Sequence, residues 1–306
     1  MAKNILDVSI ILAVYNEEQS LLKELEVIKS AMAKSRFTYE IIVVDDASTD
    51  NTARILKDIK GIKLITHSRN KGSGGSRKTG TFASGGRIVV WSDVDLTYPN
   101  HLIPELVERL ENSSFKQVVG SRLKEKGSLK ALRTPAKYFL RRLASFLTKT
   151  EIPDLNSGFR AFYREEGLKV MYMVPNGFSC VSTMTLSFLC NGRDVGYMPI
   201  EYKARVGKSK FHPIKDSYNY FLQIIRMITY FEPLRIFVPM ALVILSFTFL
   251  KHIFDLIVTK NTQETDIIGY FMAFIIFAVG LLADLIVTQN KRFMFLDQEN
   301  KQIEER

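Results

Sequence analysis

The sequence predicts an α/β domain with a mostly parallel sheet, followed by a pair of membrane-spanning helices. Short apolar runs alternate with amphipathic helical stretches across residues 8–91, which is typical of a sheet covered by helices on both faces. Two of these apolar runs end in aspartate clusters. Two further apolar stretches, residues 236–258 and 267–287, are long enough to cross a bilayer.

The individual elements follow from the spacing of apolar residues. After the first apolar run, Leu21, Leu25, Ile28 and Met32 recur at helical spacing and predict an amphipathic helix. A second helix is expected over residues 52–59, and the glycine-rich residues 72–80 are expected to form a flexible turn that leads into a short helix. The expected strands are residues 8–14, 41–44, 62–66 and 88–91.

Two carboxylates stand at the tip of the strand over residues 88–91. Side chains alternate along an extended strand, so Asp93 and Asp95 point the same way. A buried pair of like charges is costly without a cation between them, and Mg²⁺ or Mn²⁺ accepts one or two carboxylates together with substrate phosphates. The pattern therefore favours a divalent metal site. The alternative for an isolated Asp-x-Asp is a solvated turn.

The glycine-rich stretch does not match a dinucleotide or nucleoside triphosphate site. A Rossmann dehydrogenase needs glycines in its first strand-to-helix turn, but that turn here reads Tyr15, Asn16, Glu17. A Walker loop needs Gly-Lys followed by Ser or Thr, and Lys78 lacks the preceding glycine. These glycines instead predict close backbone approach to a nucleotide, or simply a turn.

Several separated motifs together resemble one family. Residues 13–17 read Ala-Val-Tyr-Asn-Glu, residues 45–50 read Asp-Asp-Ala-Ser-Thr-Asp, and residues 93–95 read Asp-Val-Asp. Residues 154–160 read Asp-Leu-Asn-Ser-Gly-Phe-Arg, and residues 205–210 read Arg-Val-Gly-Lys-Ser-Lys. In order and spacing they are similar to the motifs of glycosyltransferase family 2, and more narrowly to its polyprenyl- and dolichyl-phosphate hexose synthases.

This resemblance implies a GT-A fold, a Rossmann-like nucleotide-sugar domain that we place over residues 1–212. It implies Mg²⁺ or Mn²⁺ as cofactor, held by Asp93 and Asp95 with Thr97 standing where the family often has a metal-binding glutamine. Ala13 replaces the family's usual proline. The nucleotide-sugar contacts that the resemblance implies are Ala13, Tyr15, Glu17, Val44, Asp46, Asp93, Val94, Asp95, Arg205 and Lys210.

The acceptor would be a polyprenyl or dolichyl phosphate. Arg122, Arg133 and Ser157 are the expected contacts to its phosphate, because guanidinium groups bind phosphate bidentately. Arg160 is a further candidate for that role. Together with the two metal-binding acids, these three arginines form the expected catalytic set, and by resemblance the transfer inverts the anomeric carbon.

Charge is concentrated in one segment. Residues 122–149 hold 9 basic and 1 acidic residue, which accounts for 8 of the net charge of +10. The segment predicts a basic acceptor loop followed by an interfacial helix on an anionic bilayer, and residues 213–233 predict a second amphipathic interfacial helix. An ordinary core helix is the alternative for the latter. Nucleic acid is not an expected partner, because no recognised nucleic-acid module accompanies the charge.

Residues 234–290 predict a transmembrane hairpin, and residues 291–306 a cytosolic tail. Arg226 and Arg235 precede the hairpin, and Lys291 and Arg292 follow it, so the positive-inside rule places both ends and the catalytic domain in the cytosol of a plasma or internal membrane. His252 and Asp284 lie within the apolar stretches, where a homo-oligomer would shield them.

The expected reaction is hexose transfer from a nucleotide sugar, such as GDP-mannose or a UDP-sugar, to polyprenyl or dolichyl phosphate. One alternative is a membrane-anchored transferase acting on a polysaccharide or glycolipid. It is disfavoured because only two spans follow the domain and no Gln-x-x-Arg-Trp stretch is present. A non-catalytic nucleotide-sugar-binding scaffold is disfavoured because both metal-site acids are retained.

Overall fold

The structure is a computed structural model that describes most of the chain. The chain forms two compact units, Met1–Gln223 and Ile224–Arg306. The residues described are 6–125, 142, 144–145, 148–177, 179–203, 218, 222, 225–226 and 228–304. Most of the predicted basic loop and interfacial helix within 122–149, and about half of the amphipathic segment 213–233, therefore lie outside the described residues.

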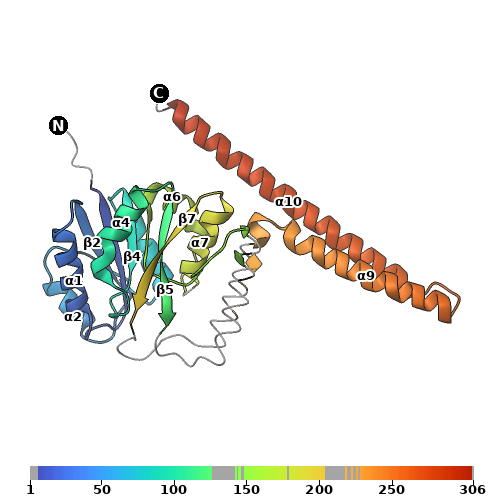
Figure 1. Cartoon of the computed structure of the whole chain (residues 1–306), viewed down its shortest axis with the longest axis horizontal. Helices are drawn as coiled ribbons and strands as arrows, with labels where there is room; N and C mark the ends of the chain where they lie inside the picture. The colour runs from blue at the N-terminus through green and yellow to red at the C-terminus, as the bar shows by residue number, and fades with distance from the viewer. Residues whose placement is uncertain are drawn as a thin grey trace. The chain divides into compact units, whose positions relative to one another are not determined.

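The first unit is built on a seven-stranded sheet with the order β3-β2-β1-β4-β6-β5-β7 (Figure 1). Its strands are β1 (Val8–Val14), β2 (Tyr39–Asp45), β3 (Lys63–Thr66), β4 (Ile88–Ser92), β5 (Gln117–Glu125), β6 (Arg160–Tyr163) and β7 (Val195–Tyr202). Neighbouring strands pair in parallel, except that β6 runs antiparallel to both β4 and β5. The predicted mostly parallel sheet is confirmed.

Helices cover both faces of this sheet. The helical elements are α1 (Leu21–Ala33), α2 (Thr52–Asp58), α3 (Ser73–Phe82), η1 (Asn100–Leu102), α4 (Ile103–Glu111), α6 (Arg164–Val170), η2 (Met171–Met173) and α7 (Cys180–Cys190). Side chains of α1, α2 and α4 enter one hydrophobic core, and those of η2 and α7 enter a second core on the opposite face. In β1, Ile10 and Leu12 belong to the first core and Ile11 to the second, so both faces are buried, as continuous apolar runs predict.

The strand register brings the motif-bearing turns to one edge of the sheet. Val14 at the end of β1 pairs with Asp45 at the end of β2. Leu12 of β1 pairs with Ser92 at the end of β4. The three turns that follow β1, β2 and β4 therefore start beside one another, at the carboxyl edge where open parallel sheets bind ligands.

The glycine-rich segment differs from the sequence prediction. Residues 73–82 form helix α3 rather than a flexible turn. The amide groups of Gly74 and Gly75 donate to the carbonyl oxygen of Asn176, at 2.8 and 3.1 Å. A Cβ atom on Gly74 would lie 2.0 Å from the carbonyl oxygen of Pro175. Glycine is needed at position 74 because another backbone segment crosses the start of the helix.

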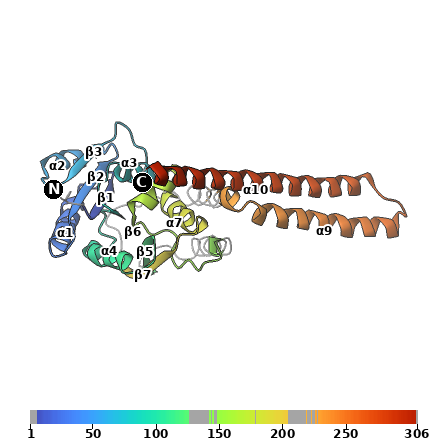
Figure 2. The same cartoon turned by 90° about the horizontal axis from the view of Figure 1, so that it is seen from above.

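The second unit is a helical hairpin (Figure 2). Its helices are α9 (Leu234–Val258) and α10 (Glu264–Glu304), and both contain a segment long and apolar enough to cross a membrane. They contain both predicted spans, and α10 stays helical through most of the predicted tail. Small side chains lie between the two helices, since Ala241, Thr248 and Ala273 are buried although most of the large apolar side chains are exposed.

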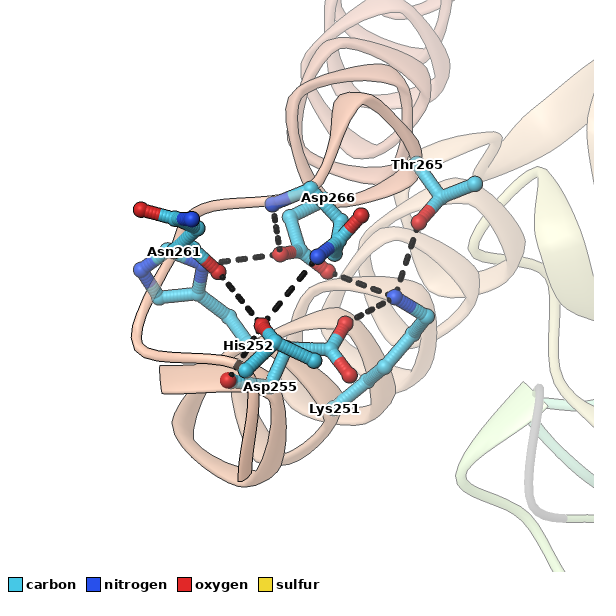
Figure 3. Close-up of polar contacts among 8 residues, drawn as sticks. Lys251, His252, Asp255, Asn261, Thr265 and Asp266 are labelled. Atoms are coloured by element: carbon cyan, nitrogen blue, oxygen red, sulfur yellow. Dashed lines mark hydrogen bonds and ion pairs between the residues drawn. The ribbon is translucent and has the colours of Figure 1, made fainter. Parts of the chain in front are cut away.

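The tip of the hairpin carries a closed group of charged side chains (Figure 3). The Nζ atom of Lys251 donates to Asp255 Oδ2 at 2.5 Å, to Thr265 Oγ1 at 2.8 Å and to Asp266 Oδ1 at 2.9 Å. His252 Nδ1 lies 3.1 Å from Asp266 Oδ2. Asp266 is fully buried. We call these four residues, Lys251, His252, Asp255 and Asp266, the hairpin-tip cluster.

Candidate active site

A pocket of about 280 Å³ opens at the carboxyl ends of β1, β2 and β4. It gathers residues that are far apart in the sequence, from the turns after three strands and from the start of α3. Seven of the ten expected nucleotide-sugar contacts line this pocket, and they are Ala13, Tyr15, Glu17, Asp46, Asp93, Val94 and Asp95.

Each of the three strand-end turns contains a residue with left-handed backbone. Asn16 follows β1 with φ of 53°, Ala47 follows β2 with φ of 61°, and Leu96 follows β4 with φ of 62°. This conformation is disfavoured for residues other than glycine, and it persists where surrounding contacts hold it. The pocket is therefore formed by turns whose shape depends on tertiary contacts.

Asp46 organises the loop that enters α3. Its Oδ1 atom accepts the amide of Lys71 at 2.8 Å, and its Oδ2 atom accepts the amide of Gly72 at 2.7 Å. His67 Nδ1 lies 2.7 Å from Asp46 Oδ1, and His67 Nε2 lies 2.9 Å from Thr79 Oγ1. The imidazole of His67 is buried and links the loop to the helix. Sequence reasoning missed His67, because nothing near it in the chain marks it.

Asp93 is joined to a buried arginine. Arg77 of α3 donates from Nη2 to Asp93 Oδ1 at 2.6 Å, and its guanidinium lies 5.7 Å from the Trp91 ring. Burial acts to lower the pKa of Arg77, but the charge of Asp93 and the contacts with Cys180 and Tyr98 together outweigh it, and the pKa is raised. Arg77 lines the pocket and sequence reasoning missed it. Its place in the glycine-rich segment was the available signal.

Gly158 lies directly against this ion pair. A Cβ atom at Gly158 would be 2.8 Å from Arg77 Nη2 and 3.1 Å from Asp93 Oδ2. Its amide donates to the Tyr98 hydroxyl oxygen at 2.7 Å. The motif over residues 154–160 therefore approaches the Asp-x-Asp turn through a position that only glycine fills.

Asp95 is held in place by Thr97. The Thr97 hydroxyl donates to Asp95 Oδ1 at 2.6 Å, and the Thr97 amide donates to the same oxygen at 3.3 Å. Thr97 is buried and Asp95 is 7% exposed. Thr97 was expected at the metal site beside Asp93 and Asp95, and in the structure it orients the Asp95 carboxylate.

The donor set of the pocket fits a hard divalent cation. Four carboxylate residues line it, Glu17, Asp46, Asp93 and Asp95, and the last two stand together on the turn after β4. The described residues contain no group of three or more His, Cys, Asp or Glu side chains that could hold a metal. Mg²⁺ and Mn²⁺ are commonly bound by one or two carboxylates and complete their coordination with water and substrate phosphate. The site therefore suits a cation that arrives with, or is completed by, a diphosphate.

Arg122 forms a bidentate ion pair. Its Nε and Nη2 atoms donate to the two oxygens of Asp154 at 2.6 and 2.8 Å, and its guanidinium lies 5.2 Å from the Tyr202 ring. Burial acts to raise the pKa of Asp154, but the hydrogen bonds and charge of Arg122 outweigh it and the pKa is lowered. Any phosphate contact by Arg122 must share this guanidinium with Asp154.

Three expected contacts lie in the interior instead. Arg160 is fully buried and donates to the backbone carbonyls of Ser157 and Val181 and to Thr185 Oγ1. The Ser157 side chain is fully buried beside it, and Val44 belongs to the second hydrophobic core. These three side chains are enclosed by protein, so the structure does not bring them to the pocket surface, and the contacts expected of Arg160, Ser157 and Val44 stay predictions.

The remaining expected residues, Arg133, Arg205 and Lys210, lie outside the described residues.

Comparison with known proteins bears on both units. The family model "Glycosyl transferase family 2" matches residues 9–168, and the model "GtrB C-terminal hairpin" matches residues 232–288. The first match covers just over half of the chain and includes β1 to β6 except for Val8, the first residue of β1.

Curated relatives share the catalytic unit. The chain is 28% identical over 211 residues to a dolichyl-phosphate hexose transferase of Haloferax volcanii, across 68% of this chain and 87% of the relative. It is 26% identical over 215 residues to a dodecaprenyl-phosphate galacturonate synthase of Rhizobium johnstonii, across 67% of this chain and 62% of the relative. For an undecaprenyl-phosphate 4-deoxy-4-formamido-L-arabinose transferase of Proteus mirabilis the identity is 31%, across 51% of this chain and 49% of the relative.

Solved structures support the fold. Glucosyl-3-phosphoglycerate synthase of Mycobacterium tuberculosis, solved with Mn²⁺, UDP and glucosyl-3-phosphoglycerate, matches with a TM-score of 0.56 at 21% identity. The match covers 72% of this chain and 80% of that one. The architecture, the motif-lined pocket and the family match agree, and the chain belongs to glycosyltransferase family 2.

Proposed function

We propose that the protein transfers a hexose from a nucleotide sugar to the phosphate of a polyprenol or dolichol. The observation that carries this proposal is the pocket, in which the turns after β1, β2 and β4 present Asp46, Asp93 and Asp95 to one cavity. The hairpin α9–α10 supports a lipid acceptor, because it brings a hydrophobic anchor to the same chain. The lipid-phosphate names of the three curated relatives point the same way.

Different pocket residues contact different parts of the nucleotide sugar. Tyr15 and Glu17 line the cavity and contact base and ribose, and Asp46 contributes chiefly by fixing the loop at Gly72. Asp93 and Asp95 hold Mg²⁺ or Mn²⁺ at the diphosphate. When bound, the cation supplies Lewis-acid neutralisation of the charge on the departing nucleotide. Arg77 fixes the direction of the Asp93 carboxylate.

The reaction depends more on the positioning of the acceptor phosphate than on a general base. A phosphate monoester has a second pKa near ~6, so the acceptor is already largely dianionic at neutral pH. An acceptor phosphate oxygen forms a bond to the anomeric carbon, and the bond from that carbon to the diphosphate oxygen breaks with its electron pair leaving on the nucleotide. Attack from the face opposite the leaving group inverts the anomeric carbon. Arg122 and Arg133 are the proposed acceptor contacts.

The catalytic unit is proposed to face the cytosol. Arg226 and Arg235 precede α9 or stand at its start, and Lys291 and Arg292 follow the apolar part of α10. At the opposite end, Lys251 is paired with Asp255 and Asp266, and Lys260 lies in the loop between the helices. The positive-inside rule counts basic residues near the span ends and therefore favours both ends of the hairpin in the cytosol.

The test uses the purified full-length protein in nanodiscs with polyprenyl phosphate, Mn²⁺ and a panel of radiolabelled nucleotide hexoses. We expect label from at least one donor to enter an organic-extractable glycolipid, and its loss when the lipid phosphate is replaced by the free alcohol. Label entering only a long glycan would support the polysaccharide alternative. Binding of donors without any transfer would support the scaffold alternative.

A further inference from the structure

A buried polar network lies under the turn that carries Asp93 and Asp95. Its centre is Asn100, the first residue of η1, which is 1% exposed. The Nδ2 atom of Asn100 donates to the carbonyl oxygen of Asp93 at 3.0 Å and to Glu24 Oε2 at 2.5 Å. Its Oδ1 atom accepts from Ser92 Oγ at 2.5 Å. One amide group therefore contacts two successive residues at the point where β4 becomes the turn.

Glu24 is an unusual residue for its position. It lies on the core-facing side of α1, beside Leu21, Leu25 and Ile28, and is only 4% exposed. Carboxyl groups are seldom buried unless they have a polar partner. Burial raises the pKa of Glu24, and the hydrogen bond from Asn100 opposes that change. The sequence retains a carboxyl group where packing alone favours an apolar side chain.

The turn above this network has a shape that needs support. Leu96 has φ of 62°, which is disfavoured for a residue with a Cβ atom. On one side of Leu96, Thr97 fixes the Asp95 carboxylate at 2.6 Å. At the ends of the turn, Asn100 fixes Ser92 and the Asp93 backbone. A strained turn of this kind persists because such contacts over-determine it.

We infer that Glu24 and Asn100 are positioning residues, which hold the Asp93–Asp95 turn in the shape that binds a divalent cation and a nucleoside diphosphate. The inference rests on the proposed function of the pocket. Neither residue lines the pocket, so both act through the turn. Asn100 makes the direct contacts, and Glu24 fixes Asn100 from α1.

The experiment measures Mn²⁺ binding by the full-length protein in detergent, from the electron paramagnetic resonance signal of free Mn²⁺ in the presence of UDP or GDP. We expect Asn100→Ala to weaken Mn²⁺ binding by about 10-fold or more, the range seen when a residue supporting a metal ligand is removed. Glu24→Met should weaken it by roughly 3- to 10-fold by the same reasoning. Glu24→Gln should bind like the unaltered protein, because its amide oxygen can accept the same hydrogen bond.

Two further variants separate positioning from folding. Glu26→Met is the matched control, since Glu26 lies on the exposed face of the same helix and should leave Mn²⁺ binding unchanged. Ser92→Ala removes only the hydroxyl that Asn100 accepts from, and it is a milder test if Asn100→Ala fails to fold. Thermal unfolding followed by Trp91, the single tryptophan, measures stability in each variant.

The outcomes are distinct. The inference would be overturned if the variants lowered the melting temperature but bound Mn²⁺ as tightly as the unaltered protein, because the network would then be merely structural. The variants compared are Glu24→Met, Asn100→Ala and Ser92→Ala. The absence of Mn²⁺ binding by the unaltered protein with either nucleotide would also overturn the inference. If the variants change Mn²⁺ affinity as expected but the unaltered protein makes no glycolipid, the lipid-transfer proposal fails while the positioning role stands.

Discussion

The chain places buried or half-buried carboxylates in two regions, and their surroundings are opposite in kind. In the hairpin-tip cluster, Asp255 and Asp266 both bond to Lys251, and His252 contacts Asp266 as well (Figure 3). In the catalytic unit, Asp93 and Asp95 line a cavity of about 280 Å³. The carboxylates of the hairpin-tip cluster are paired with Lys251 of the protein itself. Those of the catalytic unit face a cavity where a ligand can bind.

This contrast distinguishes a structural cluster of carboxylates from a binding site. A carboxylate that is enclosed with its own ammonium partner has little need for a metal, because pairing and hydrogen bonds already compensate for its burial. The Asp93 side chain is instead 31% exposed even though Arg77 holds one of its oxygens. The carboxylates of Asp93 and Asp95 line the cavity. Those of the hairpin-tip cluster are directed at neighbouring side chains of the protein.

The strongest test of this contrast is Asp95→Ala. Removing a metal ligand that stabilises charge on the leaving group should lower the transfer rate by about 10³-fold or more, with little change in melting temperature. The rate is measured with saturating donor and Mn²⁺. Asp58→Ala, on the exposed side of α2, is the control, and equal activity of the two variants would contradict the metal assignment.

Gly158→Ala should have the next largest effect. The added methyl group would lie 2.8 Å from Arg77 Nη2 and 3.1 Å from Asp93 Oδ2, so the ion pair must shift. We expect a loss in kcat of roughly 10- to 100-fold, since small displacements of catalytic groups are costly. Gly85→Ala is the control, because its Cβ would meet nothing closer than 3.6 Å. Normal turnover in Gly158→Ala would show that the pair tolerates movement.

Lys251→Met tests the other side of the comparison. It leaves the buried Asp266 without its lysine, so the melting temperature of the full-length protein should fall by several degrees. The double variant Lys251→Met, Asp266→Asn should recover most of that loss. Lys260→Met, in the exposed loop between the helices, should have no effect. Loss of transfer in Lys251→Met without any loss of stability would mean that the hairpin-tip cluster has a functional role.

The smallest expected effect concerns pH. The pKa of Asp154 is lowered below its ordinary 3.8, so the stability from its pairing with Arg122 is present above that pH and is lost as the pH falls through the lower, folded-state pKa. Asp154→Asn should flatten the acid limb of the stability curve by about 1 kcal/mol. Urea unfolding between pH 5 and pH 3 measures it, and parallel acid limbs would contradict the assignment.

Much of the catalytic unit follows from local sequence. The apolar run over residues 8–14 forms β1 as predicted, because a strand buried on both faces needs no alternation. Asp93 and Asp95 could be placed at the pocket because a parallel sheet brings its strand ends to one edge. The burial of Arg160 could not be predicted. Its motif identifies a segment near the site but does not indicate whether a given side chain enters the cavity or the core.

From the sequence one can predict strands β1 to β4, the motif-bearing turns and the two apolar helices, since periodicity and apolar length depend only on neighbours along the chain. Strands β5, β6 and β7 were not predicted. Only the tertiary structure decided which charges are paired. Arg77 meets Asp93 across 16 positions, and Asn100 meets Glu24 across 76. Contacts at such separations depend on how helices pack on the sheet, and that packing sets which carboxylates are compensated by the protein and which remain directed at a ligand.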